Sequence, residues 1–210
     1  MKEMMGKSTL ECAKFVVGQN SSIESVIVRP YFYIPNKISE GEEKIKIERE
    51  HFLNSFNPNE ILKTQTEGTN IALDSNLILR GGVEAYWPMA DMAPGKTNDN
   101  LSKIEQRVGE ILFSFTGATF LLETNRSYHM LGTNILNDKE KWLDFLGTCL
   151  ISSIVTKTPD GQPNIHEVIV DYRYIGHSII RRSTGLRLTT EGKKTVSPKV
   201  IAIVENERIK

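Results

Sequence analysis

A short apolar run, Val168-Ile169-Val170, ends in a single acid, Asp171, and cations follow closely. Such residues favour a buried strand, and a carboxylate at its end is costly unless a counter-charge or a ligand compensates it. From Tyr172 to Lys199 the sequence has seven Lys or Arg residues and one acid, Glu191, although the whole chain has 26 basic and 26 acidic residues. This asymmetry favours a metal ion and a polyphosphate near Asp171.

The length and composition are those of an ordinary globular protein. With 210 residues, 39% of them hydrophobic and 25% charged, the chain is long enough for a substantial core. We expect a single domain made of a small N-terminal αβ unit, residues 1–80, and a motif-bearing unit, residues 81–210. Because the charges balance overall, only a local patch could bind nucleic acid.

The two cysteines, Cys12 and Cys149, lie far apart in apolar, helical-looking sequence. This excludes a disulfide scaffold, disfavours a zinc site and predicts buried free thiols. The first residues lack the apolar region of a signal peptide, and no apolar run approaches the ~20 residues needed to cross a bilayer. We therefore expect a cytoplasmic protein with no membrane partner.

The hydrophobic periodicity predicts alternating helices and strands. From Val83 onward the order is β-α-β-α-β-β, which indicates an α+β fold with a mixed or antiparallel sheet covered by helices. The Rossmann glycine fingerprint and the P-loop are absent, so the two commonest nucleotide-binding folds are excluded. Helices are expected at 10–17, 49–56, 59–63, 101–113 and after Asp138, strands at 26–34, 83–91, 118–130, 168–174, 186–189 and 200–204, and a loop at 37–46.

Asp91 also ends a predicted strand, just before the turn residues Pro94-Gly95. Two carboxylates delivered by neighbouring strands can share a hard divalent cation such as Mg²⁺ or Mn²⁺. In phosphoryl transfer, two such cations lie ~4 Å apart and hold the attacking and leaving oxygens. An aspartate at a strand end is also a common turn former, so both interpretations of Asp91 stay open.

Ser127-Tyr128-His129 lies on a predicted strand, so Ser127 and His129 face one side and Tyr128 faces the other. A hydroxyl and an imidazolium side by side could bind a phosphate. A nucleophilic Ser–His pair is the rival interpretation. Neighbours on a strand point in parallel and no GxSxG turn is present, which favours phosphate binding.

Basic residues follow Asp171 in a stretch that could grip phosphates. Arginine suits bidentate phosphate contacts and lysine supplies point charges. The alternative is a solvated, charged loop. The stretch contains Arg181, Arg182, Arg187, Lys193, Lys194 and Lys199.

Taken in order, these segments resemble the catalytic core of the archaeo-eukaryotic primase (primase-polymerase) superfamily. That family has a hydrophobic-Asp-x-Asp/Glu motif, a Ser-x-His motif, a hydrophobic-Asp motif and then basic residues. The counterparts here are Met89–Ala93, Ser127–His129, Val170-Asp171 and the stretch 181–194, and the likeness spans residues 83–204. It implies a primase-polymerase-like core with an RRM-like unit, flanking helices and the small N-terminal αβ unit.

The resemblance implies a nucleotidyltransferase that joins nucleoside triphosphates on a single-stranded or primed nucleic acid with Mg²⁺ or Mn²⁺. Asp91 and Asp171 would be the metal ligands and, with His129, the catalytic residues. A helicase or accessory subunit, if one takes part, would be a separate chain. The residues implied to contact the phosphates or the template backbone are Ser127, His129, Arg181, Arg182, Arg187 and Lys194.

Ala93 departs from the family pattern, because the first motif normally supplies two acids. The natural sequence could have lost the acid, which would leave a catalytically inactive nucleotide- or nucleic-acid-binding regulator or subunit. Alternatively, an acid has been replaced by alanine deliberately, since one substitution would restore Asp-Met-Asp. A third hypothesis is an unrelated α+β interaction module whose motifs coincide by chance. The sequence leaves the three open.

Overall fold

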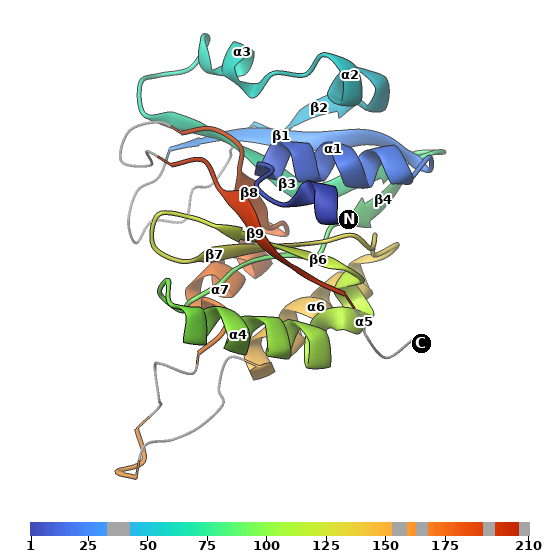
Figure 1. Cartoon of the computed structure of the whole chain (residues 1–210). Coiled ribbons are helices and arrows are strands. Elements are labelled where there is room, and N and C mark those ends of the chain that lie inside the picture. The colour runs from blue at the N-terminus through green and yellow to red at the C-terminus, as the bar shows by residue number, and fades with distance from the viewer. Residues whose placement is uncertain (33–42, 153–158, 163–167, 191–195, 206–210) are drawn as a thin grey trace.

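The computed structural model describes residues 1–32, 43–152, 159–162, 168–190 and 196–205. Two antiparallel sheets form its centre (Figure 1). The first has the order β2-β1-β3-β4, and β8 also pairs with β3. Its strands are β1 (Ile23–Phe32), β2 (Ile45–Glu48), β3 (Thr69–Leu79), β4 (Val83–Tyr86) and β8 (Gly185–Arg187). The second has the order β5-β7-β6-β9, with β5 (Met89–Asp91), β6 (Thr119–Glu123), β7 (Tyr128–Gly132) and β9 (Lys199–Val204).

Most of the helices cover the outer sides of this arrangement. Figure 1 shows α2 and α3 beyond the first sheet and α4 to α7 beyond the second sheet, whereas α1 lies at the level between the two sheets, where its Phe15 packs edge-on against Phe120 of β6. In the part of the chain that is described, no helix is long and apolar enough to cross a membrane. The helices are η1 (Lys2–Met4), α1 (Thr9–Gln19), α2 (Arg49–Asn54), α3 (Pro58–Leu62), α4 (Asn98–Arg107), the π-helical η2 (Val108–Leu112), α5 (Phe113–Thr116), α6 (Lys139–Ser152) and α7 (Tyr172–Arg181).

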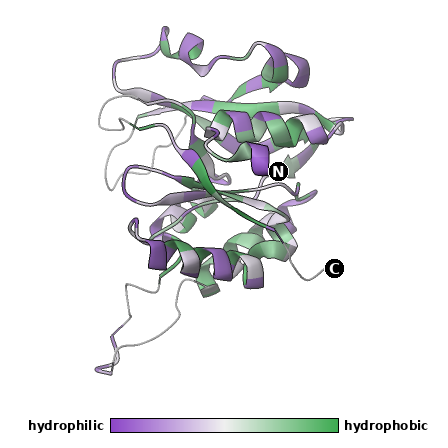
Figure 2. Ribbon diagram, in the orientation of Figure 1, coloured by the Kyte–Doolittle hydropathy of each residue, from purple (hydrophilic) through white to green (hydrophobic). Residues whose placement is uncertain are grey.

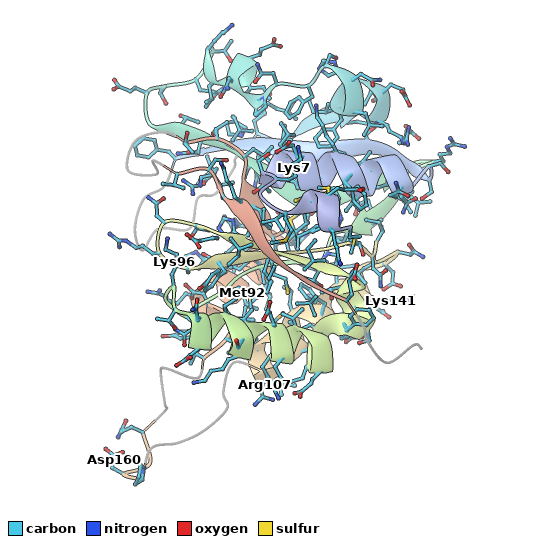
Figure 3. All side chains as sticks on the ribbon, in the orientation of Figure 1. Lys7, Met92, Lys96, Arg107, Lys141 and Asp160 are labelled. Atoms are coloured by element: carbon cyan, nitrogen blue, oxygen red, sulfur yellow. The ribbon has the colours of Figure 1, made fainter. Side chains whose placement is uncertain are left out.

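The second sheet separates two hydrophobic cores. Met89 belongs to the core between the sheets, whereas Ala90 and Met92 belong to the core under the helices. Figure 2 shows hydrophobic residues concentrated in the sheets, and Figure 3 shows Met92 inside while Lys96 and Arg107 point outward. Because side chains alternate along a strand, Asp91 faces the same way as Met89, toward the first sheet.

Strand β8 brings the C-terminal part of the chain onto the first sheet. Ala72 of β3 pairs with Arg187 and Asp74 pairs with Gly185. The other half of β3 pairs with β4, which leads through the buried Trp87 into β5 of the second sheet. The expected division into residues 1–80 and 81–210 stays a prediction, and the strands on its two sides are hydrogen-bonded to each other.

The predicted α+β class with antiparallel sheets is confirmed, but several predicted elements differ from the structure. Residues 83–91 form two strands in different sheets, and 118–130 form a hairpin with a turn at 124–127. The strand expected at 168–174 is wrong, because only Val170 forms a β-bridge and helix α7 begins at Tyr172. Strand β3 was not predicted, because three polar residues at 74–76 interrupt its apolar pattern. Most of the loop expected at 37–46 lies outside the described residues.

A buried ion pair fixes β8 against the first sheet. Arg29 Nε lies 3.2 Å from Asp74 Oδ2, and both side chains are buried. Ser183, just before β8, donates a hydrogen bond of 2.8 Å to the same oxygen. A Cβ on Gly185 would lie 2.6 Å from Arg29 Nη2, so a larger residue here would displace the guanidinium from its position. The ion pair between Arg29 of β1 and Asp74 of β3 thus fixes the position of strand β8, which contains Arg187.

Replacing Asp74 with Asn tests this support. The amide keeps the shape but leaves Arg29 buried without its counter-ion, so we expect the free energy of unfolding to fall by about 3 kcal/mol in urea denaturation. The matched control is Glu24→Gln, because Glu24 lies 3.5 Å from Lys46 in an exposed pair and its loss should cost less than about 1 kcal/mol. Equal losses in the two variants would contradict the assigned role.

Candidate nucleotide and metal site

Three predicted site residues form a row across three neighbouring chain segments. Asp91 on β5 stands directly opposite His129 on β7. On the other side, the Asp171 N–H donates to the Asp91 carbonyl oxygen at 2.9 Å, next to a bridge between Met92 and Val170. Directly opposite residues of antiparallel segments share a face, with Cβ atoms about 5 Å apart. Backbone pairing alone therefore brings His129, Asp91 and Asp171 together.

The side chains of His129 and Ser127 approach the Asp91 carboxylate. His129 Nε2 lies 3.9 Å from Asp91 Oδ1, and Ser127 Oγ donates to the same oxygen at 3.5 Å. The predicted alternation is confirmed, because Tyr128 is buried in the other core and its hydroxyl donates to the Thr97 carbonyl at 3.3 Å. A hydroxyl and an imidazole thus flank one carboxylate that is one-third exposed.

The turn between β6 and β7 fixes Ser127. The Thr124 N–H donates to the Ser127 carbonyl at 2.9 Å, and the Ser127 N–H donates to the Thr124 hydroxyl oxygen at 3.1 Å. The two hydroxyl oxygens also lie 3.4 Å apart. Thr124 was not singled out from the sequence, although a threonine three residues before a serine at a strand junction is typical of such a side-chain-to-backbone turn.

Asp171 is the N-cap of α7. Its Oδ1 accepts hydrogen bonds from the N–H groups of Arg173 at 2.9 Å and Tyr174 at 3.4 Å. The Arg173 guanidinium also contacts the carboxylate, with Nε 3.3 Å from Oδ1 and Nη2 3.3 Å from Oδ2. Since the Arg173 side chain is 71% exposed, this contact is weak, and a cation at Oδ2 could displace it at little cost.

Arg187 lies on the β8 side of the site, within electrostatic range of Asp91. It is buried, its Nη2 donates to the Val196 carbonyl at 2.9 Å, and its Nη1 has no hydrogen-bond partner among the residues described. Burial lowers the pKa of the guanidinium from its ordinary value, and Tyr31 and Asp91 oppose that effect. A buried donor without a partner costs free energy, so an anionic ligand here would stabilise the protein.

Tyr174 joins α7 to β8 below the site. Its hydroxyl donates to the Gly185 carbonyl at 3.1 Å and accepts from the Gly185 N–H at 3.0 Å. Burial raises the pKa of this phenol, and the negative charge of Asp91 raises it further. Tyr174 therefore stays neutral and serves to hold α7 and β8 at a fixed distance.

The remaining predicted basic residues have separate locations. Arg181, in the last turn of α7, is partly buried and acts on the pKa of Tyr174 through its charge. Arg182 is exposed and ends the helix in the left-handed region, with φ of 60°. Lys199 is exposed at the start of β9. Lys193 and Lys194 lie outside the described residues.

The two carboxylates could supply oxygen ligands to one divalent cation. Asp91 and Asp171 are cross-strand neighbours with side chains 34% and 22% exposed, and they offer the oxygen ligands that Mg²⁺ and Mn²⁺ prefer, with water or phosphate completing the shell. Within the described ranges, no group of three or more His, Cys, Asp or Glu side chains could hold a metal ion. A second cation would need a further acid.

Ala93 occupies the place where that acid would stand. Its N–H donates to the Ile169 carbonyl at 3.0 Å, so the antiparallel pairing continues past Met92. Met92 points into the core and Ala93 is exposed. By alternation, the Cβ of Ala93 lies on the same face as Asp91. A carboxylate could therefore be added at this position without disturbing the core.

The comparisons with known proteins agree with this geometry. The model of the family described as "AEP-like: Archaeo-eukaryotic primase 1D-like" matches residues 49–199, well over half of the chain. Searches of curated proteins and of solved structures gave no significant match. The fold and the match define a primase-like α+β protein. The chain belongs to the archaeo-eukaryotic primase-like family, as its motifs predicted.

The two roles of Asp171 can be separated by mutation. Asp171→Ser keeps an N-cap oxygen but removes the charge, so we expect near-normal stability and at least tenfold weaker Mn²⁺ binding, measured by electron paramagnetic resonance of free Mn²⁺. Asp171→Ala should lose both the cap, at about 1 kcal/mol, and the cation. Unchanged Mn²⁺ affinity in the serine variant would show that Asp171 acts only as a helix cap.

Proposed function

We propose that this protein is a primase-polymerase-like nucleotidyltransferase that joins nucleoside triphosphates on a nucleic-acid template with Mg²⁺ or Mn²⁺. The row of His129, Asp91 and Asp171 carries the proposal, since it joins two carboxylates and an imidazole on one face. Membership of the primase-like family agrees with nucleotide and nucleic-acid substrates. A separate helicase or accessory subunit remains part of the same hypothesis.

Catalysis at this site would consist mainly of positioning and charge neutralisation. Asp91 and Asp171 would hold the cation, which when bound neutralises phosphate charge and aligns the reacting oxygens. The Ser127 hydroxyl and the His129 imidazole, 3.5 Å and 3.9 Å from the Asp91 carboxylate, would donate hydrogen bonds to the phosphates beside it.

Arg187 would supply the fixed positive charge. Its Nη1 lies buried without a hydrogen-bond partner in the described part of the chain, so it can donate to a phosphate oxygen without first losing another bond. The buried Arg29–Asp74 pair holds the backbone of β8, and the guanidinium is therefore in place before the substrate arrives. Such preorganisation is what makes charge stabilisation effective in a site.

Ala93 favours a second candidate function, that of a nucleotide- or nucleic-acid-binding subunit without catalysis. The exposed alanine leaves the site one carboxylate short of a full ligand set for two cations. One cation with Arg187 would suffice to bind a triphosphate, whereas aligning a 3′-hydroxyl against the α-phosphate is assigned to the second cation in two-metal transfer. The two candidates therefore share a binding site and differ in turnover.

Restoring the acid separates the two candidates. We expect Ala93→Asp to raise templated incorporation with Mn²⁺ at least tenfold above the original chain, measured by extension of a labelled primer and by synthesis on an unprimed template. Ala93→Asn is the matched control, since it has nearly the same volume but no charge. Nucleotide binding without any synthesis by the aspartate variant would refute the enzyme and leave the binding subunit.

A further inference from the structure

Helix α7 has an exposed apolar face that the proposed site does not use. Tyr172, Ile179 and Ile180 are 61%, 43% and 59% exposed, while Ile175 and Ser178 of the same helix are buried. At 3.6 residues per turn the three exposed side chains lie on one side of the helix. An apolar stripe of this kind, unlike scattered exposed residues, marks a binding surface. We call these residues, with Gly176, the α7 face.

Gly176 lies in the middle of the α7 face, four residues from both Tyr172 and Ile180. No heavy atom comes within 4 Å of a Cβ placed at this position, so packing inside the chain does not require glycine. A glycine inside a helix costs roughly 0.5–1 kcal/mol relative to alanine. The residue leaves a gap between the exposed side chains, where the backbone of another molecule can approach the helix closely.

The charges around the α7 face favour a polyanion as its ligand. Of the four arginines between Tyr172 and Thr190, Arg173 and Arg182 are exposed, Arg181 is partly buried and Arg187 is buried on β8, and the acid Asp171, which pairs with Arg173, precedes them. Arg173 is 71% exposed at the start of the helix, and Arg182 is exposed at its end. A second copy of the chain would bring like charges together, which disfavours self-association. Phosphates, by contrast, would complement both ends of the helix.

The α7 face is continuous with the proposed site. Asp171, which caps the helix, is hydrogen-bonded through its backbone to Asp91, and Tyr172 is the next residue. A nucleic-acid strand lying along the helix would therefore reach the edge of the site at the residue that caps the helix, Asp171. From position 172 to 180 the helix is about 12 Å long, so the contact would extend well beyond a single nucleotide of the site.

We propose that the α7 face binds the single-stranded nucleic acid that leads into the site. Tyr172 stacks on a base, Gly176 admits the sugar-phosphate backbone, and Arg173 and Arg182 contact phosphates. Stacking on an exposed aromatic ring with arginine nearby is a general mode of single-strand binding and tolerates any base sequence. The inference rests on the proposed function for the identity of the ligand and assigns that ligand a surface outside the carboxylate row.

Fluorescence anisotropy with labelled single-stranded DNA and RNA at several salt concentrations tests the inference. Tyr172→Ala should weaken binding by about tenfold, the loss of one stacking contact, and Tyr172→Phe should not. Gly176→Ala should raise the melting temperature yet weaken binding at least threefold. The matched controls lie on α6, where Gly147 likewise has no atom within 4 Å of a Cβ and Leu143 is 40% exposed. Gly147→Ala and Leu143→Ala should bind as the original chain does.

The result that overturns the inference is oligonucleotide binding by Tyr172→Ala and Gly176→Ala equal to that of the controls. Self-association that is lost in Tyr172→Ala, measured by light scattering, would also overturn it and assign the face to a second copy. Failure of this inference can be told apart from failure of the proposed function. If the α7 variants bind oligonucleotides normally and Ala93→Asp synthesises nucleic acid, only the binding surface is refuted. If the α7 variants bind weakly and Ala93→Asp shows no synthesis, only the enzyme is refuted.

Discussion

The site depends on a short antiparallel pairing between residues 91–93 and 169–171. The hydrogen bond from the Asp171 N–H to the Asp91 carbonyl, at 2.9 Å, and the one from the Ala93 N–H to the Ile169 carbonyl, at 3.0 Å, join segments nearly eighty residues apart. Without this pairing the two carboxylates would belong to separate strand ends. With it, the backbone sets their spacing, and the α7 helix starts where the pairing ends.

Two further sets of interactions hold the surroundings of that pairing. Strand β7 places His129 opposite Asp91, and the Thr124 turn holds Ser127 beside them. On the other side, the buried Arg29–Asp74 pair lies beside strand β8 and fixes the backbone from which Arg187 projects. A buried ion pair is weak evidence for stability by itself. Here its effect is positional, because it keeps a second buried arginine near Asp91 with a donor still unused.

The sequence was sufficient for the parts of the site that lie on single elements. A strand ending in Asp91 and the alternation of Ser127 and His129 follow from local periodicity, and both are present in the structure. Helix α7 was missed because Tyr172, Tyr174 and Ile175 suit a strand as well as a helix. The helix is decided by the Asp171 cap and by burial of Ile175, and burial depends on residues distant in sequence.

Strand β3 escaped prediction for a related reason. Asp74, Ser75 and Asn76 are unfavourable strand residues by intrinsic preference, and they are tolerated because partners come from elsewhere. Arg29 neutralises Asp74, and Ser75 accepts a hydrogen bond from the Thr184 N–H at 2.9 Å. The position of Arg187 within electrostatic range of Asp91 rests on the same long-range pairing, which no pattern within β8 reveals.

The central claim is that Asp91 and Asp171 together hold a divalent cation that binds a nucleoside triphosphate. The most direct test is a crystal structure with Mn²⁺ and a non-hydrolysable nucleoside triphosphate, with anomalous data collected at the manganese edge. The account predicts an anomalous peak about 2–2.5 Å from oxygens of both carboxylates, with phosphate oxygens in the same shell and near Arg187. A peak away from the two aspartates, or triphosphate bound elsewhere on the protein, would contradict it.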